Sequence, residues 1–183
     1  MDFEVSATNL GGLAKALTAQ GLLEKLAPRL APATLEILRR PHERRWHPGA
    51  VALETWGAII DVAGAPAFEA LNLKLTRDSF GPIVKPLLKV VLALGGSSPA
   101  TVLSRLDDTI KVATKGVKVT WTPSGKDSGT VIFEYPCPMP RQDVVEFGWR
   151  GAMRFGEELT GKPLVFAPVE RRSDRAFAFP VRW

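Results

Sequence analysis

The spacing of hydrophobic residues changes near residue 116, from a helical period to strict alternation. In Val117–Thr122, the side chains of Val117, Val119 and Trp121 fall on one side of an extended chain. Thr130–Tyr135 alternates in the same way after a polar turn that is rich in serine and glycine. Two alternating runs joined by such a turn predict a β-hairpin.

A second pair of strands is predicted after one long helix. Asp143–Thr160 has apolar or small residues on most of its faces, which indicates a helix buried against more than one neighbour. The three glycines in this segment are expected where another backbone or a ligand comes close. Pro163–Glu170 and Ala176–Trp183 alternate again and read as strands. This β-β-α-β-β ending predicts a four-stranded antiparallel sheet.

Residues 1–115 read as mainly helical, so the expected fold class is α+β with a helical N-terminal part and the sheet in residues 116–183. A chain of 183 residues is expected to form a single domain. Thr8 and Asn9 are the expected N-caps of the first helix, and Pro86 is expected to kink the fifth. The predicted helices are Leu10–Ala27, Ala31–Arg40, Gly49–Gly64, Pro66–Leu73, Asp78–Leu94 and Pro99–Thr109.

Composition narrows the functional classes. The 45% hydrophobic and 23% charged residues are typical of a globular protein. The net charge of +5 is spread along the chain, so nucleic acid is not the expected partner. The N-terminus lacks the pattern of a secretory signal, no uncharged run is long enough to span a bilayer, and Cys137 is the one cysteine. The cytoplasm is therefore the expected location.

The sequence offers few residues for catalysis or metal binding. His42 and His47 lie five residues apart in a charged connection, where surface side chains are expected rather than a zinc site. Cys137 lies between two prolines, with no histidine near it in the sequence. An enzyme that uses this thiol is the weakest hypothesis, and no catalytic residue and no metal site are predicted.

Aromatic residues supply the best candidates for a ligand pocket, because such pockets are mostly apolar with a few polar groups. The alternative is a plain core, since aromatic residues dominate cores as well. The predicted ligand-binding residues are Trp56, Phe68, Phe80, Trp121, Phe133, Tyr135, Trp149 and Phe166.

Arginines flank Trp46 in the connection after the second helix. Arginine beside an aromatic side chain can bind phosphate or an acidic partner, although the stems of such arginines also cover apolar surface. Arg39, Arg40, Arg44 and Arg45 are the predicted partner-binding residues, and Arg171–Arg175 is a second basic loop.

The ending of the chain resembles 4-vinyl-reductase-like domains and the related haem–nitric-oxide-binding fold. The resemblance rests on Trp149-Arg150-Gly151-Ala152-Met153, on a following glycine and on the closing strand Phe177–Trp183. The chain also resembles an uncharacterised bacterial paralogous family of about this length. These resemblances imply a small-molecule-binding or sensory domain that reports to a signalling partner.

The residues differ from the haem-binding pattern in this resemblance. Haem-binding relatives use a helical histidine and a Tyr-x-Ser-x-Arg motif, whereas this chain has Tyr135-Pro136-Cys137-Pro138-Met139. Haem is therefore not expected as a cofactor. The first hypothesis is a non-enzymatic domain that holds an apolar or aromatic small molecule between helices and sheet. The alternative is a protein-interaction adaptor with a filled pocket, which binds an acidic partner through the arginine-rich loops.

Overall fold

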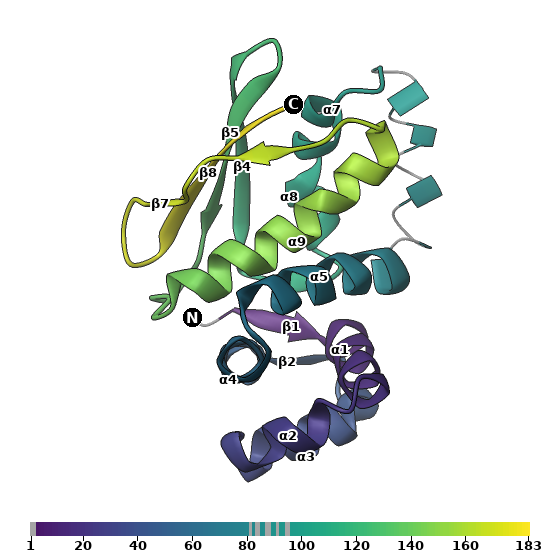
Figure 1. Cartoon of the computed structure of the whole chain (residues 1–183), viewed down its shortest axis with the longest axis vertical. Helices are drawn as coiled ribbons and strands as arrows, with labels where there is room; N and C mark the ends of the chain where they lie inside the picture. The colour runs from purple at the N-terminus through teal and green to yellow at the C-terminus, as the bar shows by residue number, and fades with distance from the viewer. Residues whose placement is uncertain (1–2, 81, 83–84, 87–88, 91, 94–95) are drawn as a thin grey trace.

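The computed structural model describes residues 3–80, 82, 85–86, 89–90, 92–93 and 96–183. The fold is α+β with antiparallel sheets, as the sequence predicts. Figure 1 shows the larger sheet in the upper half of the molecule, helix α9 lying across it, and α1 to α4 grouped in the lower half. Helix α5 lies between these two parts, alongside α9.

The larger sheet has the strand order β4-β5-β8-β6, with β7 also paired to β8. Its hairpin is the predicted one, formed by β4 (Lys118–Gly125) and β5 (Ser128–Glu134). The predicted strand 163–170 is instead two short strands, β6 (Val165–Phe166) and β7 (Glu170–Arg171), which both pair with β8 (Ala176–Arg182). The sheet therefore has five strands where four were expected.

Alternation places one row of apolar side chains on the inner face of this sheet. Val119 pairs with Phe133, which pairs with Phe177, and all three side chains are buried. The next row on the same face contains Val131 and Phe179, because residues two apart along a strand point to the same side. The prediction that alternate residues of the hairpin share one side is thus confirmed, and the structure shows that this side faces the core.

A second sheet of three short strands was not predicted. Its order is β2-β1-β3, from β1 (Glu4–Ser6), β2 (Trp46–Pro48) and β3 (Thr114–Lys115). Runs of two or three residues are too short for alternation to be read from the sequence. This sheet ties the N-terminus to the segment just before the hairpin.

The helical part follows the predicted order with local differences. Helix α1 (Ala7–Ala19) starts earlier than expected, since Ser6 is its N-cap and its Oγ accepts from the Asn9 N–H at 3.3 Å. Gly21 has a φ of +62° and ends the first helix early. The elements that follow are α2 (Leu23–Leu26), η1 (Ala27–Arg29), α3 (Pro32–Arg39), η2 (Pro41–Glu43), α4 (Gly49–Ala63), α5 (Ala65–Leu75) and the π-turn η3 (Thr76–Phe80).

Two short helices replace one predicted helix before the hairpin. They are α7 (Pro99–Leu103) and α8 (Leu106–Ile110). Helix α9 (Gln142–Thr160) matches its prediction and ends at Gly161, whose φ of +70° is the left-handed form that glycine favours. Most of the predicted helix Asp78–Leu94, including the expected kink at Pro86, depends on positions outside the described residues.

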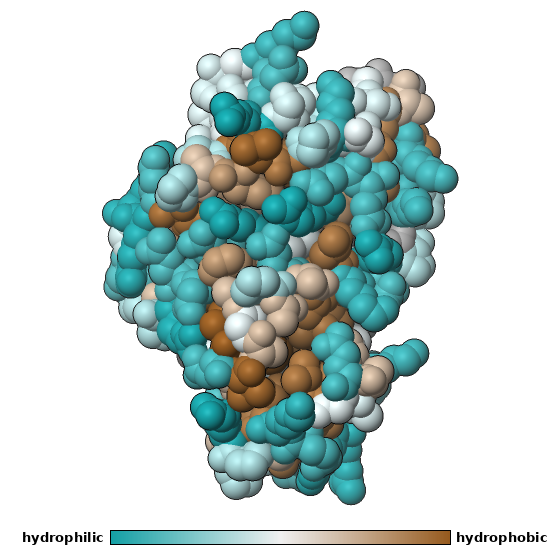
Figure 2. Space-filling view, viewed as in Figure 1, coloured by the Kyte–Doolittle hydropathy of each residue, from teal (hydrophilic) through white to brown (hydrophobic). Residues whose placement is uncertain are grey.

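One hydrophobic core joins the lower helices to the inner face of the sheet. Some apolar side chains of the lower half are only partly covered, among them Leu22, Leu23 and Leu53. Figure 2 shows apolar side chains gathered in this lower half, over α4 and its neighbours, with hydrophilic ones around them. Among the described helices, none has the length and apolar character needed to cross a bilayer.

Candidate functional site

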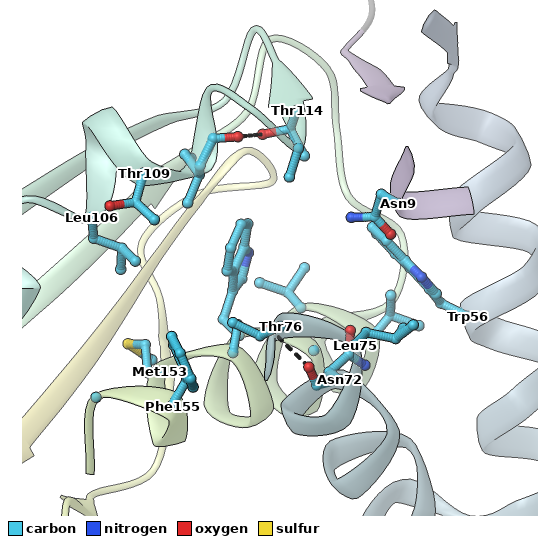
Figure 3. A pocket seen from close by; sticks show the side chains of 18 of the residues that line it. Asn9, Trp56, Asn72, Leu75, Thr76, Leu106, Thr109, Thr114, Met153 and Phe155 are labelled. Carbon is cyan, nitrogen blue, oxygen red and sulfur yellow. Dashed lines mark hydrogen bonds between the residues drawn. The ribbon is translucent and has the colours of Figure 1, made fainter. Parts of the chain in front are cut away.

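A cavity of about 110 Å³ lies where α5, α8 and α9 meet, with Asn9 of α1 and Trp56 of α4 completing one end. Figure 3 shows side chains from these elements facing a common space. An engineered apolar cavity of roughly 150 Å³ binds benzene, so a space of this size takes a molecule of about one ring. The remaining described lining includes Leu75, Leu106, Ile110, Met139, Val145, Gly148, Ala152, Met153 and Phe155.

Helices α5 and α9 approach closely because α9 has a glycine at their crossing. A Cβ on Gly151 would lie 2.3 Å from the Glu69 carbonyl oxygen and 2.8 Å from Asn72 Cβ. Gly148 is less crowded, with Phe68 Cε1 at 3.5 Å from an added Cβ. The expectation that a glycine of this helix admits another backbone is therefore confirmed at Gly151, and the backbone belongs to α5.

The side of the cavity wall that lies toward the larger sheet, called the sheet side below, is formed around Trp149 of α9, which packs on Phe133 of β5. Its indole Nε1 donates to the Tyr135 hydroxyl at 2.6 Å. Its ring stacks on Phe133 with centroids 4.2 Å apart and planes 18° apart. Burial raises the pKa of Tyr135, so the phenol keeps its proton at neutral pH. This wall is neutral, aromatic and hydrogen-bonded.

The opposite end of the wall contains an unpaired polar atom. Trp56 Nε1 is buried and has no hydrogen-bond partner within the described chain. The Trp56 ring packs against Phe68, with centroids 6.4 Å apart. Asn9 also lines this end, and in Figure 3 its side chain appears next to Trp56.

An arginine links the Trp56 helix to the start of α9. Arg141 donates from Nη1 to the Gly57 carbonyl at 3.2 Å and to Asp61 Oδ1 at 2.8 Å. Its Nε donates to Asp143 Oδ1 at 3.0 Å. This hydrogen bond and charge hold the pKa of Asp143 below its usual value, while the two carboxylates raise the pKa of Arg141. The two walls of the cavity are thus held together by a charged link outside it.

The predicted ligand-binding residues separate into three groups. Trp56, Tyr135 and Trp149 line the cavity. Phe68 and Phe133 are fully buried and lie directly behind it, against Trp56 and Trp149. The structure therefore brings five of these side chains into one cluster.

The other three predicted residues lie elsewhere. Trp121 packs against Trp183, with ring centroids 6.0 Å apart. The guanidinium carbons of Arg150 and Arg154 lie 5.7 and 5.5 Å from the ring centroid of Phe166. The side chain of Phe80 is outside the described part of the structure.

Sequence reasoning missed most of the α9 lining, although a signal was present. Val145, Gly148 and Ala152 recur at intervals of three and four residues, which places them on one helix face. Asn9 and Asn72 gave no such signal, because polar residues in a helix are usually on its solvent side.

The predicted partner-binding arginines Arg39, Arg40, Arg44 and Arg45 are all exposed. Arg40 forms a surface ion pair with Glu43 at 3.7 Å. In the second basic loop, Arg171 donates to the Met139 carbonyl at 3.3 Å and Arg175 to the Pro136 carbonyl at 3.2 Å. These two arginines hold the proline-rich connector that contains Cys137.

No protein-family model matches the chain, and no curated protein matches it either. Solved structures of H-NOX proteins do share its fold. The Fe(II) unliganded H-NOX protein from K. algicida has a TM-score of 0.66 at 11% identity, over 97% of this chain and 95% of that one.

Two further solved structures share the fold of this chain. One, titled for modulating heme redox potential through porphyrin distortion, has a TM-score of 0.55 at 9% identity, over 97% of this chain and 99% of that one. An oxygen-binding H-NOX domain related to soluble guanylate cyclases has a TM-score of 0.52 at 10% identity, over 96% and 89%. The chain therefore has the fold of these domains, as the resemblance to the haem–nitric-oxide-binding fold predicted.

The expectation that haem is not a cofactor is corrected by these neighbours. The solved structures with this fold include one on heme redox potential and porphyrin distortion and one on heme distortion in the H-NOX family. Side chains able to ligate haem iron are histidine, cysteine, methionine and tyrosine, and Tyr135, Met139 and Met153 represent them in the described lining. His42 is exposed, and His47 is buried with its Nε2 2.7 Å from the Pro41 carbonyl.

Proposed function

We propose that residues 1–183 act as one non-enzymatic small-molecule-binding or sensory domain, and that the cavity between α5, α8 and α9 is its ligand site. The observation that carries this proposal is an apolar cavity whose wall is aromatic and only partly hydrogen-bonded. Ligand sites typically combine such a lining with a few placed polar groups. The fold of the H-NOX neighbours supports the sensory role.

Haem is the first ligand to test, because solved structures with this fold concern heme. Met139, Met153 and Tyr135 would be its candidate iron ligands from the described lining. The cavity as it stands suits about one ring, so a haem would require it to widen.

The test is native mass spectrometry of the freshly purified chain, with an absorption spectrum before and after addition of hemin. An added mass or a Soret band that disappears in Ala152→Phe supports the proposal, since this change fills the cavity from α9. Ala67→Phe is the matched control, because Ala67 is an exposed residue of α5 outside the cavity lining. Ligand retained in Ala152→Phe would exclude this cavity as the site.

The adaptor remains a second candidate function because of one observation. Arg39, Arg44 and Arg45 are exposed and form no hydrogen bond or ion pair through their side chains within the described chain. Such free guanidinium groups suit an acidic partner. Charge reversal at Arg44 and Arg45 would abolish capture of that partner, whereas unchanged capture would remove this candidate.

The remaining predictions depend on the sequence. They are the cytoplasmic location, a signalling partner, and the closer likeness to 4-vinyl-reductase-like domains and to the bacterial paralogous family.

A further inference from the structure

The polar groups of the cavity wall differ in whether they have partners. Most are used within the protein. Asn72 Nδ2 donates to the Phe68 carbonyl at 2.9 Å, and the Thr76 hydroxyl donates to the Asn72 carbonyl at 2.8 Å. The hydroxyls of Thr109 and Thr114 likewise donate to backbone carbonyls one helical turn earlier. The hydroxyl protons of these threonines and one N–H of Asn72 are therefore already used within the protein.

Trp56 and Asn9, which both line the cavity, differ from these groups and from Tyr135, because their side chains form no hydrogen bond at all within the described chain. Trp56 Nε1 is buried without an acceptor, and the Asn9 side-chain amide has no hydrogen bond within the described chain. A buried donor left unpaired costs about 1–3 kcal/mol. Figure 3 shows these two side chains next to each other in the view, away from Met153 and Phe155. Two unpaired groups at one end of an apolar cavity indicate a binding point for a ligand atom.

The chemistry of this binding point restricts the ligand. An indole N–H can only donate, so the ligand atom that it binds must be an acceptor. The described lining contains no Asp, Glu, Lys, Arg or His. A carboxylate placed there would lose its hydration without gaining a counter-charge, which is strongly unfavourable. The acceptor is therefore expected on an uncharged group.

We infer that the ligand of this cavity is a neutral, apolar molecule that carries a carbonyl or similar oxygen, and that Trp56 Nε1 and the Asn9 amide bind this oxygen. The inference rests on the proposed function, because it takes the cavity as the ligand site. The rest of the ligand packs on the aromatic wall that Tyr135 and Trp149 form.

Three single-ring probes test it on the full chain. Acetophenone carries a neutral carbonyl, α-methylstyrene has nearly the same shape without the oxygen, and benzoate is charged. The readout is the indole N–H region of a ¹H–¹⁵N NMR spectrum, in which the Trp56 signal is identified by its loss in Trp56→Phe. Acetophenone is expected to bind roughly three- to tenfold more tightly than α-methylstyrene. It alone should move the Trp56 signal as a new hydrogen bond does.

The variant comparison sharpens this result. Trp56→Phe should reduce the affinity for acetophenone to that for α-methylstyrene, and it should leave the affinity for α-methylstyrene unchanged. Trp121→Phe is the matched control, because Trp121 packs against Trp183 outside the cavity lining. The three-probe comparison on the unaltered chain stands even where Trp56→Phe fails to fold.

The outcomes separate the two proposals. Equal affinities for acetophenone and α-methylstyrene, or tighter binding of benzoate, would overturn the inference and leave the ligand cavity in place. A different outcome would reject the proposed function, and the inference with it: no probe binds, and the purified Ala152→Phe variant carries the same bound molecules as the unaltered protein.

Discussion

The sheet side of the cavity wall and its helical side differ in how their polar groups are paired. On the sheet side, Trp149 donates to Tyr135 at 2.6 Å and stacks on Phe133. On the helical side, Trp56 has a buried indole N–H with no acceptor among the described residues, and Asn9 also lines the cavity. The same residue type is therefore used in two ways within one cavity.

This difference separates stability from binding. Buried polar groups in folded proteins are nearly always hydrogen-bonded, so a paired indole is the expected structural arrangement. An unpaired one costs folding free energy that an acceptor atom of a ligand can recover. We therefore expect substitutions on the sheet side to affect unfolding, and those at Trp56 to affect ligand binding.

The largest effect is expected for Phe133→Ala. Phe133 is 0% exposed and lies between Trp149 and Phe179. Removal of a fully buried aromatic ring costs about 3–5 kcal/mol. Urea unfolding should show a lower midpoint with an unchanged slope.

Val165→Ala is the control at a half-exposed position of the same sheet, where a change within about 0.5 kcal/mol is expected. A loss below about 1 kcal/mol at Phe133 would contradict a packed sheet wall.

Two glycines of α9 give the next effect. Gly151→Ala places a Cβ 2.3 Å from the Glu69 carbonyl oxygen, which is backbone and cannot turn away. We expect a loss of about 1–3 kcal/mol from this overpacking. Gly148→Ala meets only ordinary contacts at 3.5 Å and should gain up to about 1 kcal/mol of helix propensity. The two glycines lie three residues apart on one helix, and thermal unfolding should give shifts of opposite sign for the two variants. Equal shifts would show that the α5–α9 crossing is not fixed by Gly151.

A pair of Trp→Phe substitutions compares the two walls directly. Both remove similar ring volume, but Trp149→Phe also takes the donor from Tyr135, whereas Trp56→Phe breaks no hydrogen bond. We expect Trp149→Phe to cost about 1 kcal/mol more in the free energy of unfolding. Urea unfolding of both variants checks this difference. A larger loss at Trp56 would mean that its N–H has a partner in the folded protein.

The sequence predicted the sheet side better than the helical side for a physical reason. Alternation in β4, β5 and β8 is a local pattern, and it directly states which side chains face the core. The hairpin residues that share one side were therefore predicted correctly. The split of the expected strand 163–170 into β6 and β7 was not visible, because it depends on how β8 is paired along its length.

The cavity itself depends on contacts between elements distant in the sequence. Gly151 could be expected to admit a neighbour, but not that Glu69 of α5 would be that neighbour. Asn9 was expected to cap α1, and Ser6 caps it instead, so the Asn9 side chain is left to line the cavity. Because the start of this helix was predicted about one turn too late, Asn9, one of the two residues of the proposed binding point, was not predicted as a lining residue.

The smallest effect concerns the charged link that joins the walls, and it depends on pH. Arg141 donates to Asp143 and holds the pKa of that carboxyl below its ordinary value of 3.8. Because the folded protein binds this proton more weakly than the unfolded chain, the stabilisation is complete above the ordinary pKa. It is lost as the pH falls through the lowered pKa of the folded state. Both side chains are more than one-third exposed, so solvent weakens the effect.

Urea unfolding between pH 7 and pH 2 should show the stability advantage of the unaltered protein over Asp143→Asn shrinking below about pH 4. Asp127→Asn, in the exposed β4–β5 turn, is the matched control and should show no such trend. An advantage that stays constant down to pH 2 would mean that Arg141 holds the α4 and α9 walls together without Asp143.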